Sequence, residues 1–546
     1  MVNFIFVTGG VVSSLGKGIT VASIGKMIKS RGMSVAIMKL DPYLNVDPGT
    51  MSPYQHGEVF VTVDGSETDL DLGHYERFID VELTSMSNVT AGQIYSEVIA
   101  NEREGKYLGG TIQTVPHVTD AIRSRLFKLA EFSKSDVIII EVGGTVGDIE
   151  GQPFIEAIRQ MRRVVGQERT FYIHITLLPF LSSTEELKTK PTQHSVQELR
   201  GMGIMPDAIL CRSDIEIQEA VKSKIALYCD VNNDAVISLP TLDNVYKVPI
   251  HLENEGLGKI IAEKFRMPKI SIDLSEWEKT TTSDFSNRTE INICIVGKYI
   301  ELHDSYMSVI EAIKHAGMLH KVSVNIKWVS SESIEIDKPN LDNLFNNVNG
   351  FIVPGGFDPR GVEGMILTAN FAREKKIPYL GLCLGMQIMV IEFTRNVLGI
   401  KDANSLEMSE STNNPVISFM EGQENLKSTG GTMRLGSYEC KLKTGTVARN
   451  AYGLELVKER HRHRYELNNS YRDRLEKFGL IPSGTSPDDS LVEVVEVSDH
   501  PFMVGSQFHP EFASRPERPH PLFREFISAS IKTYVEGDQH FLFQNK

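Results

Sequence analysis

Short apolar runs recur through the first half of the chain and predict buried strands. Each run is rich in β-branched residues and is bounded by glycine, proline or polar turn residues; the runs are Phe4–Thr8, Ser34–Leu40, Val137–Val142, Thr170–Leu177 and Ala208–Arg212. Between them, stretches such as Ala121–Ser133 repeat apolar residues at helical spacing. Continuous apolar strands that alternate with helices are typical of a parallel sheet covered on both faces. The pattern therefore predicts an α/β fold.

The alternation stops near Pro268, where a polar segment without periodicity runs to Glu290. A segment of this kind is expected to be a linker. A second α/β series then begins, with predicted strands at Ile291–Val296, Gly350–Pro354, Ile377–Leu382 and Leu491–Val497. Because 546 residues are too many for one hydrophobic core, we expect two domains, residues 1–267 and 291–546, joined by a linker at 268–290.

Charge and cysteine content exclude several classes of protein. The net charge of −14 argues against broad binding to nucleic acid or membrane surfaces. No apolar run approaches the roughly 18 to 20 residues that span a bilayer, and the N-terminal apolar run leads straight into a glycine loop, which favours a core strand over a signal peptide. The five cysteines are Cys211, Cys229, Cys294, Cys383 and Cys440, with no Cys-x-x-Cys pair. A reducing, cytoplasmic setting without disulfides or a zinc knuckle is expected.

The segment Gly9–Gly18 predicts a phosphate-binding loop. It follows the first predicted strand and precedes a helical pattern, so backbone N–H groups and a helix N-terminus would face an anion. Lys17 adds a cation that can follow a transferring phosphoryl group. The match to the P-loop pattern is imperfect, because Gly18 stands where a metal-binding hydroxyl is expected. A glycine turn with a solvated lysine is the alternative.

Charged residues lie at the ends of two predicted strands and in a turn, and we expect them near this loop. Lys39 ends the second strand, and ligands bind at the carboxyl ends of strands in open α/β sheets. Glu141 directly follows the apolar positions 137–140, and Asp71 lies in an acidic turn. Carboxylates beside a phosphate loop are the ligands that magnesium requires. For Asp71, capping of a turn is the alternative. Further along, Lys188–Gln193 and Lys224 form a basic group that, taken alone, is more typical of a solvated loop than of a binding site.

Cys383 is the candidate nucleophile of the second half. Gly381 and Gly385 flank it in a strand–turn–helix pattern that lifts a nucleophile above a sheet. A helix N-terminus favours the thiolate, which attacks carbonyl groups. His509 would be the base and Glu511 the group that orients it. An inert buried thiol is the alternative, and we accept it for the other four cysteines.

Two further segments of the second half suggest ligand contacts. Val353–Phe357 ends a predicted strand with two glycines, which suits an oxyanion hole of backbone N–H groups. In Arg460–Arg464, arginines alternate with histidines. This alternation favours an anion-contacting loop over a metal site.

Three long motifs resemble the CTP synthase family: Gly9–Gly18, Leu40–Phe60 and Glu141–Glu150. The C-terminal half is similar to class I glutamine amidotransferases, as the second domain of that family is. The resemblance covers nearly the whole chain. It implies an N-terminal P-loop-type amidoligase domain and a C-terminal glutaminase domain. The implied reaction is phosphorylation of the O4 atom of UTP by ATP, followed by displacement of phosphate by ammonia released from glutamine.

The resemblance assigns roles residue by residue. ATP would contact Ser14, Leu15, Gly16, Lys17, Gly18, Ile19, Lys39 and Asp71, and magnesium would bind Asp71 and Glu141. UTP, or CTP as a feedback inhibitor, would contact Ser13, Asp148, Ile149, Glu150, Lys188, Thr189, Lys190, Pro191, Thr192, Gln193 and Lys224. Cys383, His509 and Glu511 would form the glutaminase triad. Glutamine would contact Gly356, Leu384, Gly385, Met386, Gln387, Glu407 and Arg464.

The resemblance also implies features beyond the two reaction sites. Pro53, His56 and Val59 fall where the family lines an ammonia passage. GTP activation and assembly into a homotetramer of two dimers are expected, with the pyrimidine site shared between subunits. The family usually has Gly-x-Arg-Gly after the phenylalanine of the lid, whereas this chain has Asp358-Pro359-Arg360-Gly361. That replacement stiffens the loop associated with GTP activation and adds a negative charge.

Two other functions are compatible with parts of the sequence. A different ATP-dependent amidoligase would activate a carboxylate instead of a uracil carbonyl, but Ser13–Gly18 and Lys188–Gln193 match the pyrimidine-nucleotide version. A nucleotide-sensing scaffold would not need Lys17, Lys39, Cys383 and His509, and all four are present. The sequence therefore favours glutamine-dependent CTP synthesis.

Overall fold

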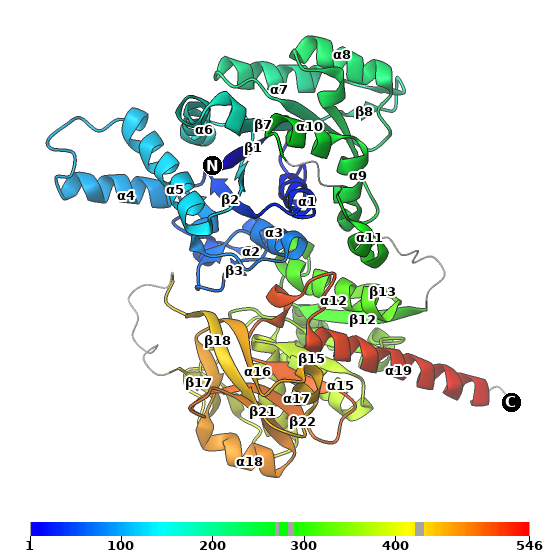
Figure 1. Ribbon diagram of the computed structural model, residues 1–546. Coiled ribbons are helices and arrows are strands. Elements are labelled where there is room, and N and C mark those ends of the chain that lie inside the picture. The colour runs from blue at the N-terminus through cyan, green and yellow to red at the C-terminus, as the bar shows by residue number, and fades with distance from the viewer. Residues whose placement is uncertain (1, 268–271, 282–288, 421–430, 545–546) are drawn as a thin grey trace. The chain divides into compact units, whose positions relative to one another are not determined.

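The computed structural model describes residues 2–267, 272–281, 289–420 and 431–544 (Figure 1). Contacts between Cα atoms divide the chain into two compact units. Unit 1 comprises Met1–Pro48 and Asp71–Thr282, and unit 2 comprises Gly49–Leu70 and Ser283–Lys546. Each unit has its own central sheet.

Unit 1 is built on a seven-stranded sheet in the order β11-β10-β7-β1-β6-β2-β5. All its recorded pairings are parallel, as the continuous apolar runs predicted. The strands are β1 (Asn3–Gly9), β2 (Val35–Asp41), β5 (Asn88–Thr90), β6 (Val137–Val142), β7 (Thr170–Leu177), β10 (Ala208–Ser213) and β11 (Val236–Pro240). The five strands predicted in this half are therefore confirmed, with bounds that differ by at most one residue.

Helices cover both faces of this sheet. The helices of unit 1 are α1 (Lys17–Lys29), α3 (Asp71–Ile79), α4 (Ala91–Arg103), α5 (Thr119–Ser133), α6 (Gln152–Val165), α7 (Lys190–Gly201), α8 (Glu219–Cys229), α9 (Val248–Asn254), α10 (Leu257–Lys264) and α11 (Ser275–Thr281). Phe4 and Phe6 share a buried cluster with apolar residues of α4, α5 and α6. The alternate face carries Ile37 and Ile139, against which α1 packs at Gly25.

Unit 2 contains a nine-stranded mixed sheet in the order β13-β12-β14-β15-β23-β22-β21-β18-β19. The first five strands pair in parallel and the last four are added antiparallel. They are β12 (Glu290–Gly297), β13 (Ser323–Ser330), β14 (Gly350–Val353), β15 (Tyr379–Leu382), β18 (Arg434–Leu442), β19 (Leu456–His463), β21 (Leu480–Thr485), β22 (Val492–Val497) and β23 (Met503–Ser506). A small sheet joins β16 (Ala403–Ser405), β17 (Asn414–Phe419) and β20 (Tyr465–Leu467).

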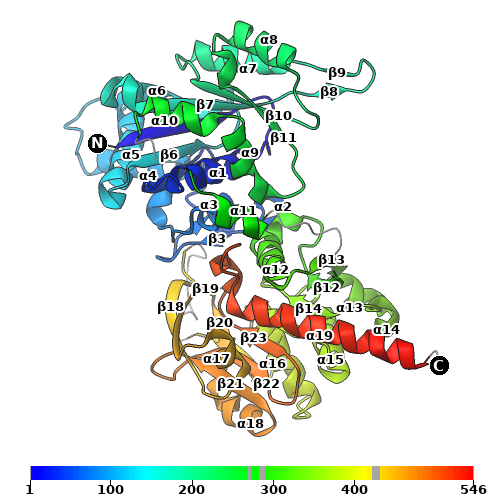
Figure 2. The same ribbon diagram turned by 45° about the vertical axis from the view of Figure 1, so that its right-hand side comes forward.

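Two layers of helices cover the large sheet of unit 2 (Figure 2). Its helices are α2 (Pro53–His56), α12 (Met307–His320), α13 (Ser331–Asp337), α14 (Leu341–Leu344), α15 (Val362–Lys375), α16 (Leu384–Asn396), α17 (Val447–Tyr452), α18 (Arg472–Lys477) and α19 (Pro521–Gln544). Cys294 and Phe351 face the cluster of α15 and α16, whereas Ile293 and Ile352 face that of α12 and α19. This alternation confirms the predicted α/β character of the second half.

The expected domain boundaries differ from the observed division. Residues 49–70, with the hairpin of β3 (Phe60–Val61) and β4 (Glu67–Thr68), belong to unit 2 although they were expected within 1–267. The expected linker contains α11, whose Trp277 is buried in unit 1 and donates from Nε1 to the Tyr246 carbonyl at 2.7 Å. A single buried indole fixes this helix, which is why periodicity did not reveal it. Positions 268–271 and 282–288 of the expected linker lie outside the described residues.

Among the described residues, none of the helices combines the length and apolar character that crossing a membrane requires.

Candidate functional site

The loop after β1 has the backbone of an anion-binding turn. Its φ angles are positive at Val11 (80°), Ser14 (57°) and Gly16 (80°), the residue that caps α1. Lys17 is the first residue of α1, and its Nζ donates to the Gly144 carbonyl at 2.7 Å. The structure thus has the predicted strand, turn and helix N-terminus, and the loop after β6 lies beside them.

Asp71 and Lys39 meet beside this helix. Asp71 is the first residue of α3, and its carboxylate forms an ion pair with Nζ of Lys39. An ideal Cβ at Gly18 would lie 1.9 Å from Asp71 Oδ1. The missing hydroxyl at position 18 is thereby explained, because the carboxylate occupies the space next to the glycine.

Glu141 ends its strand inside the same region. It is 1% exposed, and the Tyr75 hydroxyl donates to its Oε2. Burial and the charge of Asp71 raise the pKa of Glu141 to about 8. Two carboxyl groups close enough for their charges to interact gain from a divalent cation with oxygen ligands. Asp71 and Glu141 therefore fit a magnesium ion.

A close approach places the middle of α7 beside the phosphate loop. An ideal Cβ at Gly10 would lie 1.6 Å from Ser195 Oγ, so only glycine allows this contact. The Ser195 hydroxyl also lies 2.8 Å from Nε2 of His174, whose Nδ1 lies 2.9 Å from Thr8 Oγ1. Burial lowers the pKa of His174 to about 3, so its ring is neutral. This buried chain of contacts joins the loop to the helix that begins at Lys190.

The predicted nucleotide residues around α7 divide into buried and exposed groups. Thr189, Thr192 and Gln193 are buried, and Gln193 Nε2 donates to Thr189 Oγ1 at 3.0 Å. Lys188 is paired with Glu186 at 2.6 Å, and the charge of Lys224 acts on the same carboxylate. Lys188 and Lys224 therefore both lie near the Glu186 carboxylate.

The remaining predicted nucleotide contacts lie on loops. Ser13 is exposed within the phosphate loop, and Ile149 is 79% exposed after β6. Asp148 accepts a hydrogen bond from the Thr145 N–H at 2.8 Å, and the Val146 N–H donates to the Gly9 carbonyl at 2.8 Å. The structure therefore brings the loops after β1 and β6 together, whereas it leaves the side chain of Ile149 in solvent.

In unit 2, Cys383 stands at a sharp turn between β15 and α16. Its φ of 52° and ψ of −100° are strained values for a residue with a side chain. An ideal Cβ added at Gly381 would lie 2.5 Å from the carbonyl oxygen of Gly385. One added at Gly385 would lie 1.9 Å from the carbonyl oxygen of Val353. Both glycines are required by backbone packing, as the turn pattern predicted.

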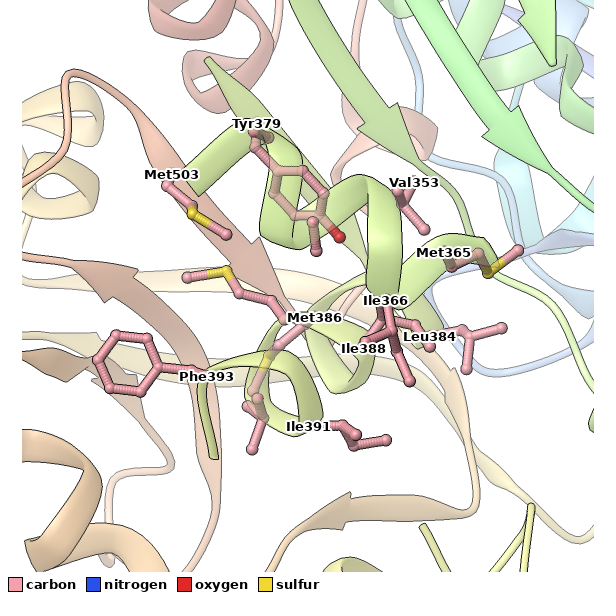
Figure 3. Close-up of a cluster of buried hydrophobic side chains, with 14 of the residues drawn as sticks. Val353, Met365, Ile366, Tyr379, Leu384, Met386, Ile388, Ile391, Phe393 and Met503 are labelled. Carbon is pink, nitrogen blue, oxygen red and sulfur yellow. The ribbon is translucent and has the colours of Figure 1, made fainter. Parts of the chain in front are cut away.

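The core beneath the turn holds it in place. Figure 3 shows Met386, Ile388 and Phe393 of α16 among buried apolar side chains that include Met503. The buried Tyr379 hydroxyl donates to the Gly385 carbonyl at 2.9 Å. Dense packing of this kind resists relaxation, so the strained conformation of Cys383 persists.

His509 and Glu511 complete a three-residue arrangement with Cys383. His509 Nδ1 lies 2.7 Å from Glu511 Oε1, and both side chains are buried. Burial alone lowers the pKa of His509, but the charges of Glu511 and Cys383 outweigh it and raise the pKa to about 10. An ideal Cβ at Gly355 would lie 3.0 Å from His509 Cε1 and 3.7 Å from Cys383 Cβ, which shows that the two side chains converge. The predicted nucleophile, base and orienting carboxylate are thus brought together.

A cavity of about 120 Å³ opens onto these three side chains. It is lined on one side by Cys383, His509 and Glu511 and by the predicted oxyanion-hole glycines at 355 and 356. Another side is formed by residues 49–59, including Pro53 and Val59. All of these residues belong to unit 2.

Lys298 supports the loop that carries those glycines, and the sequence analysis missed it. Its side chain is fully buried, and Nζ donates to the carbonyls of Phe357, at 2.8 Å, and Asp358. The Asp358 carboxylate is also 3.1 Å from Nη2 of Arg360, so the added negative charge of this loop is paired. A lone lysine after a strand gave no local signal for this contact.

The predicted glutamine contacts are only partly assembled around the cavity. Gly356 lines it, whereas the side chains of Leu384 and Met386 lie in the core. Glu407 Oε1 accepts from the Asp358 N–H at 3.1 Å, and the charge of Arg464 acts on the same carboxylate. The cavity lining contains neither of these two charged residues.

The predicted loop at 460–464 is wrong, because most of it is strand β19 (Leu456–His463). Arg460 and Arg462 extend to residues 49–70: Arg460 Nη1 donates to the Val61 carbonyl at 3.1 Å, and Arg462 Nε lies 2.8 Å from Glu67 Oε1. His461 and His463 are buried, with Nδ1 and Nε2 3.0 Å apart. Alternation of two polar types concealed the strand, because neither face of it is apolar.

His461, His463 and Glu493 are the group of described residues whose possible metal-ligand atoms lie within 4.8 Å of one another. His463 Nδ1 is 3.0 Å from the Tyr465 carbonyl and must donate to it, so His463 Nε2 accepts from His461 Nδ1. Arg434 Nη2 lies 2.8 Å from Glu493 Oε1. A hydrogen bond therefore joins the two histidines, and the Arg434 guanidinium pairs with the Glu493 carboxylate.

Two family models match the two halves of the chain. A family model described as CTP synthase N-terminus matches residues 3–267, and one described as glutamine amidotransferase class-I matches residues 301–529. CTP synthase of Dehalococcoides mccartyi is 59% identical over 539 residues, covering 99% of both chains. CTP synthase of Thermomicrobium roseum is 57% identical, covering 99% of this chain and 97% of the relative.

A solved structure of the Trypanosoma brucei CTPS glutaminase domain with bound acivicin is also similar, at 36% identity. It covers 44% of this chain and 94% of the solved chain, with a TM-score of 0.42. The two CTP synthases named above each cover 99% of this chain, at 59% and 57% sequence identity. The chain therefore belongs to the CTP synthase family.

Proposed function

We propose that this chain converts UTP to CTP in an ATP-dependent reaction that takes its nitrogen from glutamine. The observation that carries this proposal is the joint presence of two sites on one family member. Unit 1 has an anion-binding loop with Lys17, and unit 2 has Cys383 facing the His509–Glu511 pair. An enzyme that activates a carbonyl with ATP and releases ammonia from an amide needs both.

In unit 2, the arrangement supports nucleophilic attack on the glutamine amide. The Cys383 sulfur, as thiolate beside the His509 imidazolium, attacks the amide carbon, and N–H groups of the 355–356 loop would hold the oxyanion. His509 then gives its proton to the departing nitrogen, which leaves as ammonia. Water hydrolyses the remaining thioester to glutamate and restores the thiol. Glu511 keeps the imidazole oriented throughout.

In unit 1, we assign ATP to the loop from Ser14 to Ile19, with Lys17 and Lys39 beside the phosphates. Asp71 and Glu141 would hold magnesium, which supplies charge neutralisation at the transferring phosphoryl group. The uracil O4 atom attacks the γ-phosphorus of ATP and ADP leaves. Ammonia then attacks C4, and phosphate departs with the former O4 oxygen. Phosphorylation is needed because an unmodified carbonyl oxygen is a poor leaving group.

The pyrimidine nucleotide is assigned to the surface around the start of α7. Ser13, Lys188–Gln193 and Lys224 provide cations and hydroxyl groups there, and Gly10 allows α7 to approach the phosphate loop. CTP as feedback inhibitor is assigned to the same region together with Asp148, Ile149 and Glu150. The contacts between the loops after β1 and β6 support this placement.

The cavity in unit 2 is assigned to released ammonia. Pro53 and Val59 line it together with Cys383, so an ammonia molecule formed at the sulfur would enter a space bordered by residues 49–59. His56, the third residue of the predicted passage, lies 3.3 Å from Asp69 through Nε2. A closed path keeps ammonia from protonation, and only its neutral form attacks C4.

Family membership is the basis on which we propose how the enzyme is regulated and how it assembles. Activation by GTP through the lid at 354–361, a homotetramer of two dimers and a cytoplasmic location are proposed on that basis. The pairing of Asp358 with Arg360 and Lys298 is compatible with a working lid, because the added charge is neutralised.

The proposal is tested by CTP formation from UTP, ATP and magnesium, with glutamine and with ammonium chloride in parallel. The wild type is expected to use both nitrogen sources, and Lys17→Ala neither. If ATP is hydrolysed but no CTP forms with either source, the pyrimidine assignment is wrong, and carboxylate acceptors should be examined. If no nucleotide is consumed while nucleotides still bind, the chain is a sensor.

A further inference from the structure

Two buried glutamine side chains connect the Cys383 sulfur to the backbone of β20 (Tyr465–Leu467). Gln507 follows β23 and is 0% exposed; Gln387 lies in the first turns of α16 and is 3% exposed. Gln507 Nε2 lies 3.6 Å from Cys383 Sγ, and Gln387 Nε2 lies 3.3 Å from Gln507 Oε1 and 3.0 Å from the Tyr465 carbonyl oxygen. None of these three contacts was expected from the sequence.

The hydrogen-bond chemistry fixes the orientation of both amides. A backbone carbonyl can only accept, so the Gln387 group facing Tyr465 must be its NH₂. The second N–H of the same group then faces Gln507, which must present Oε1 to it. Consequently Gln507 turns its NH₂ toward the sulfur. A flip of either amide would place two donors or two acceptors against each other in a buried site.

A fixed N–H donor affects the two forms of the sulfur differently. The thiolate accepts a hydrogen bond from Gln507, and bonds to charged acceptors are stronger than those to neutral ones. The thiol can direct its own proton to the Arg462 carbonyl, which lies 3.8 Å from Sγ. When that proton moves to His509, the amide donor remains in place to stabilise the anion.

We propose that Gln507 is the hydrogen-bond donor that stabilises the Cys383 thiolate, and that Gln387 is the positioning residue that fixes its orientation. This inference rests on the proposed glutaminase function and deepens it. It adds a role to the one that the resemblance assigned to Gln387, because its buried NH₂ donates to two protein acceptors. The other titratable or charged side chains that line the sulfur's cavity remain unchanged in the test; they are His509, Glu511, Glu58, Arg462, Tyr299 and Tyr306.

The test is the pH dependence of Cys383 alkylation by iodoacetamide in the full-length protein, followed by mass spectrometry of the peptide. Gln507→Met keeps the length of the side chain without a donor, Gln507→Glu replaces the donor with a negative charge, and Gln387→Met removes only the orienting contact. Gln167→Met, at an exposed position of unit 1, is the matched control. Ammonium-dependent CTP formation in each variant shows that the protein is folded.

The expected midpoint of the alkylation profile rises by roughly one pH unit in Gln507→Met, since the thiolate loses a hydrogen bond that favours the charged form. Gln507→Glu should shift it further, Gln387→Met less, and Gln167→Met not at all. Glutamine hydrolysis near neutral pH should fall in the same order, about tenfold for Gln507→Met. Unshifted midpoints in both Gln507 variants would overturn the inference, even if hydrolysis falls.

The same data separate this inference from the proposed function. Alkylation measures the sulfur without requiring turnover, so a shifted midpoint supports the role of Gln507 whatever the acceptor of the ammonia. Absence of glutamine hydrolysis in the wild type would instead contradict the proposed glutaminase. If Gln507→Met fails to fold, Gln387→Met supplies the decisive comparison, because its smaller shift is expected in the same direction.

Discussion

The carboxylate of Asp71 fills the place where a side chain at Gly18 would stand: an ideal Cβ there would lie 1.9 Å from Oδ1 and 2.6 Å from Cγ of the aspartate. The glycine after Lys17 therefore lets an acid from α3 reach the N-terminus of α1. In a P-loop with a hydroxyl at this position, the hydroxyl itself would contact the metal. We propose that Asp71 takes this role here.

Gly18→Ala should displace Asp71 and disable nucleotide activation. A displacement of about 1 Å near the reacting groups is enough to cost about 10²-fold in rate. We expect CTP formation to fall by at least that factor with glutamine and with ammonium, while glutamine hydrolysis continues. Gly201→Ala is the control, since a Cβ there has no neighbour within 4 Å. Equal, near-wild-type rates in both variants would show that the contact has no functional role.

Glu141→Gln should weaken the response to magnesium. The buried Glu141 carboxyl faces the charge of Asp71, which burial makes costly unless a cation binds. In the wild type, magnesium with ATP should raise the melting temperature more than ATP with EDTA does. The variant should lose most of this difference and require more magnesium for CTP formation. An unchanged magnesium dependence would exclude Glu141 as a ligand.

Glu511→Gln should shift the alkaline limb of glutamine hydrolysis to lower pH. Burial lowers the pKa of His509, but the charges of Glu511 and Cys383 raise it to about 10. The imidazolium that protonates the leaving nitrogen is thus present below this value and is lost as pH rises through it. Removing one negative charge lowers that pKa. Hydrolysis near neutral pH should also fall by about 10²- to 10⁴-fold.

The profile of glutamate release between pH 6 and pH 11 measures this effect. Ammonium-dependent CTP formation in the same variant serves as the control, because Glu511 belongs to unit 2 and takes no part in the assigned chemistry of unit 1. Superimposable alkaline limbs in wild type and variant would argue against electrostatic support of His509 by Glu511.

Lys298→Met should loosen the loop that carries Gly355 and Gly356. The lysine is fully buried and donates to the carbonyls of Phe357 and Asp358, so methionine keeps the volume but removes both bonds. We expect glutamine hydrolysis to fall by up to about 10²-fold, mainly in kcat, because the oxyanion donors lose their position. Lys314→Met, on the surface of α12, is the control. A rise in KM alone would assign Lys298 to substrate binding instead.

The sequence predicted five strands of the seven-stranded sheet and four of the nine-stranded sheet, because these strands carry mostly apolar runs. Val137–Val142 and Thr170–Leu177 were located to the residue, since burial on both faces favours apolar side chains at most positions. The phosphate loop and the Cys383 turn were found for a similar reason. Glycines that permit close backbone approach leave a mark in the sequence.

Contacts between distant polar residues left no such mark. Residues 49–70 join unit 2 through pairs such as Glu58 with the Ser308 N–H, at 3.0 Å, and Glu67 with Arg462. Strand β19 has Arg and His on opposite faces, so no apolar period identifies it. The donors Gln507 and Lys298 are likewise recognisable only once tertiary packing brings them beside Cys383 and the 355–358 loop.

The most direct test of the account compares wild type with Cys383→Ala, using glutamine and ammonium chloride as nitrogen sources for CTP formation from UTP, ATP and magnesium. Only the thiol site is disabled by this change. The account predicts that the variant loses glutamine-dependent CTP formation and keeps the ammonium-dependent rate. Equal loss with both nitrogen sources, or retention of both activities, would contradict the assignment of two chemically separate sites to the two units.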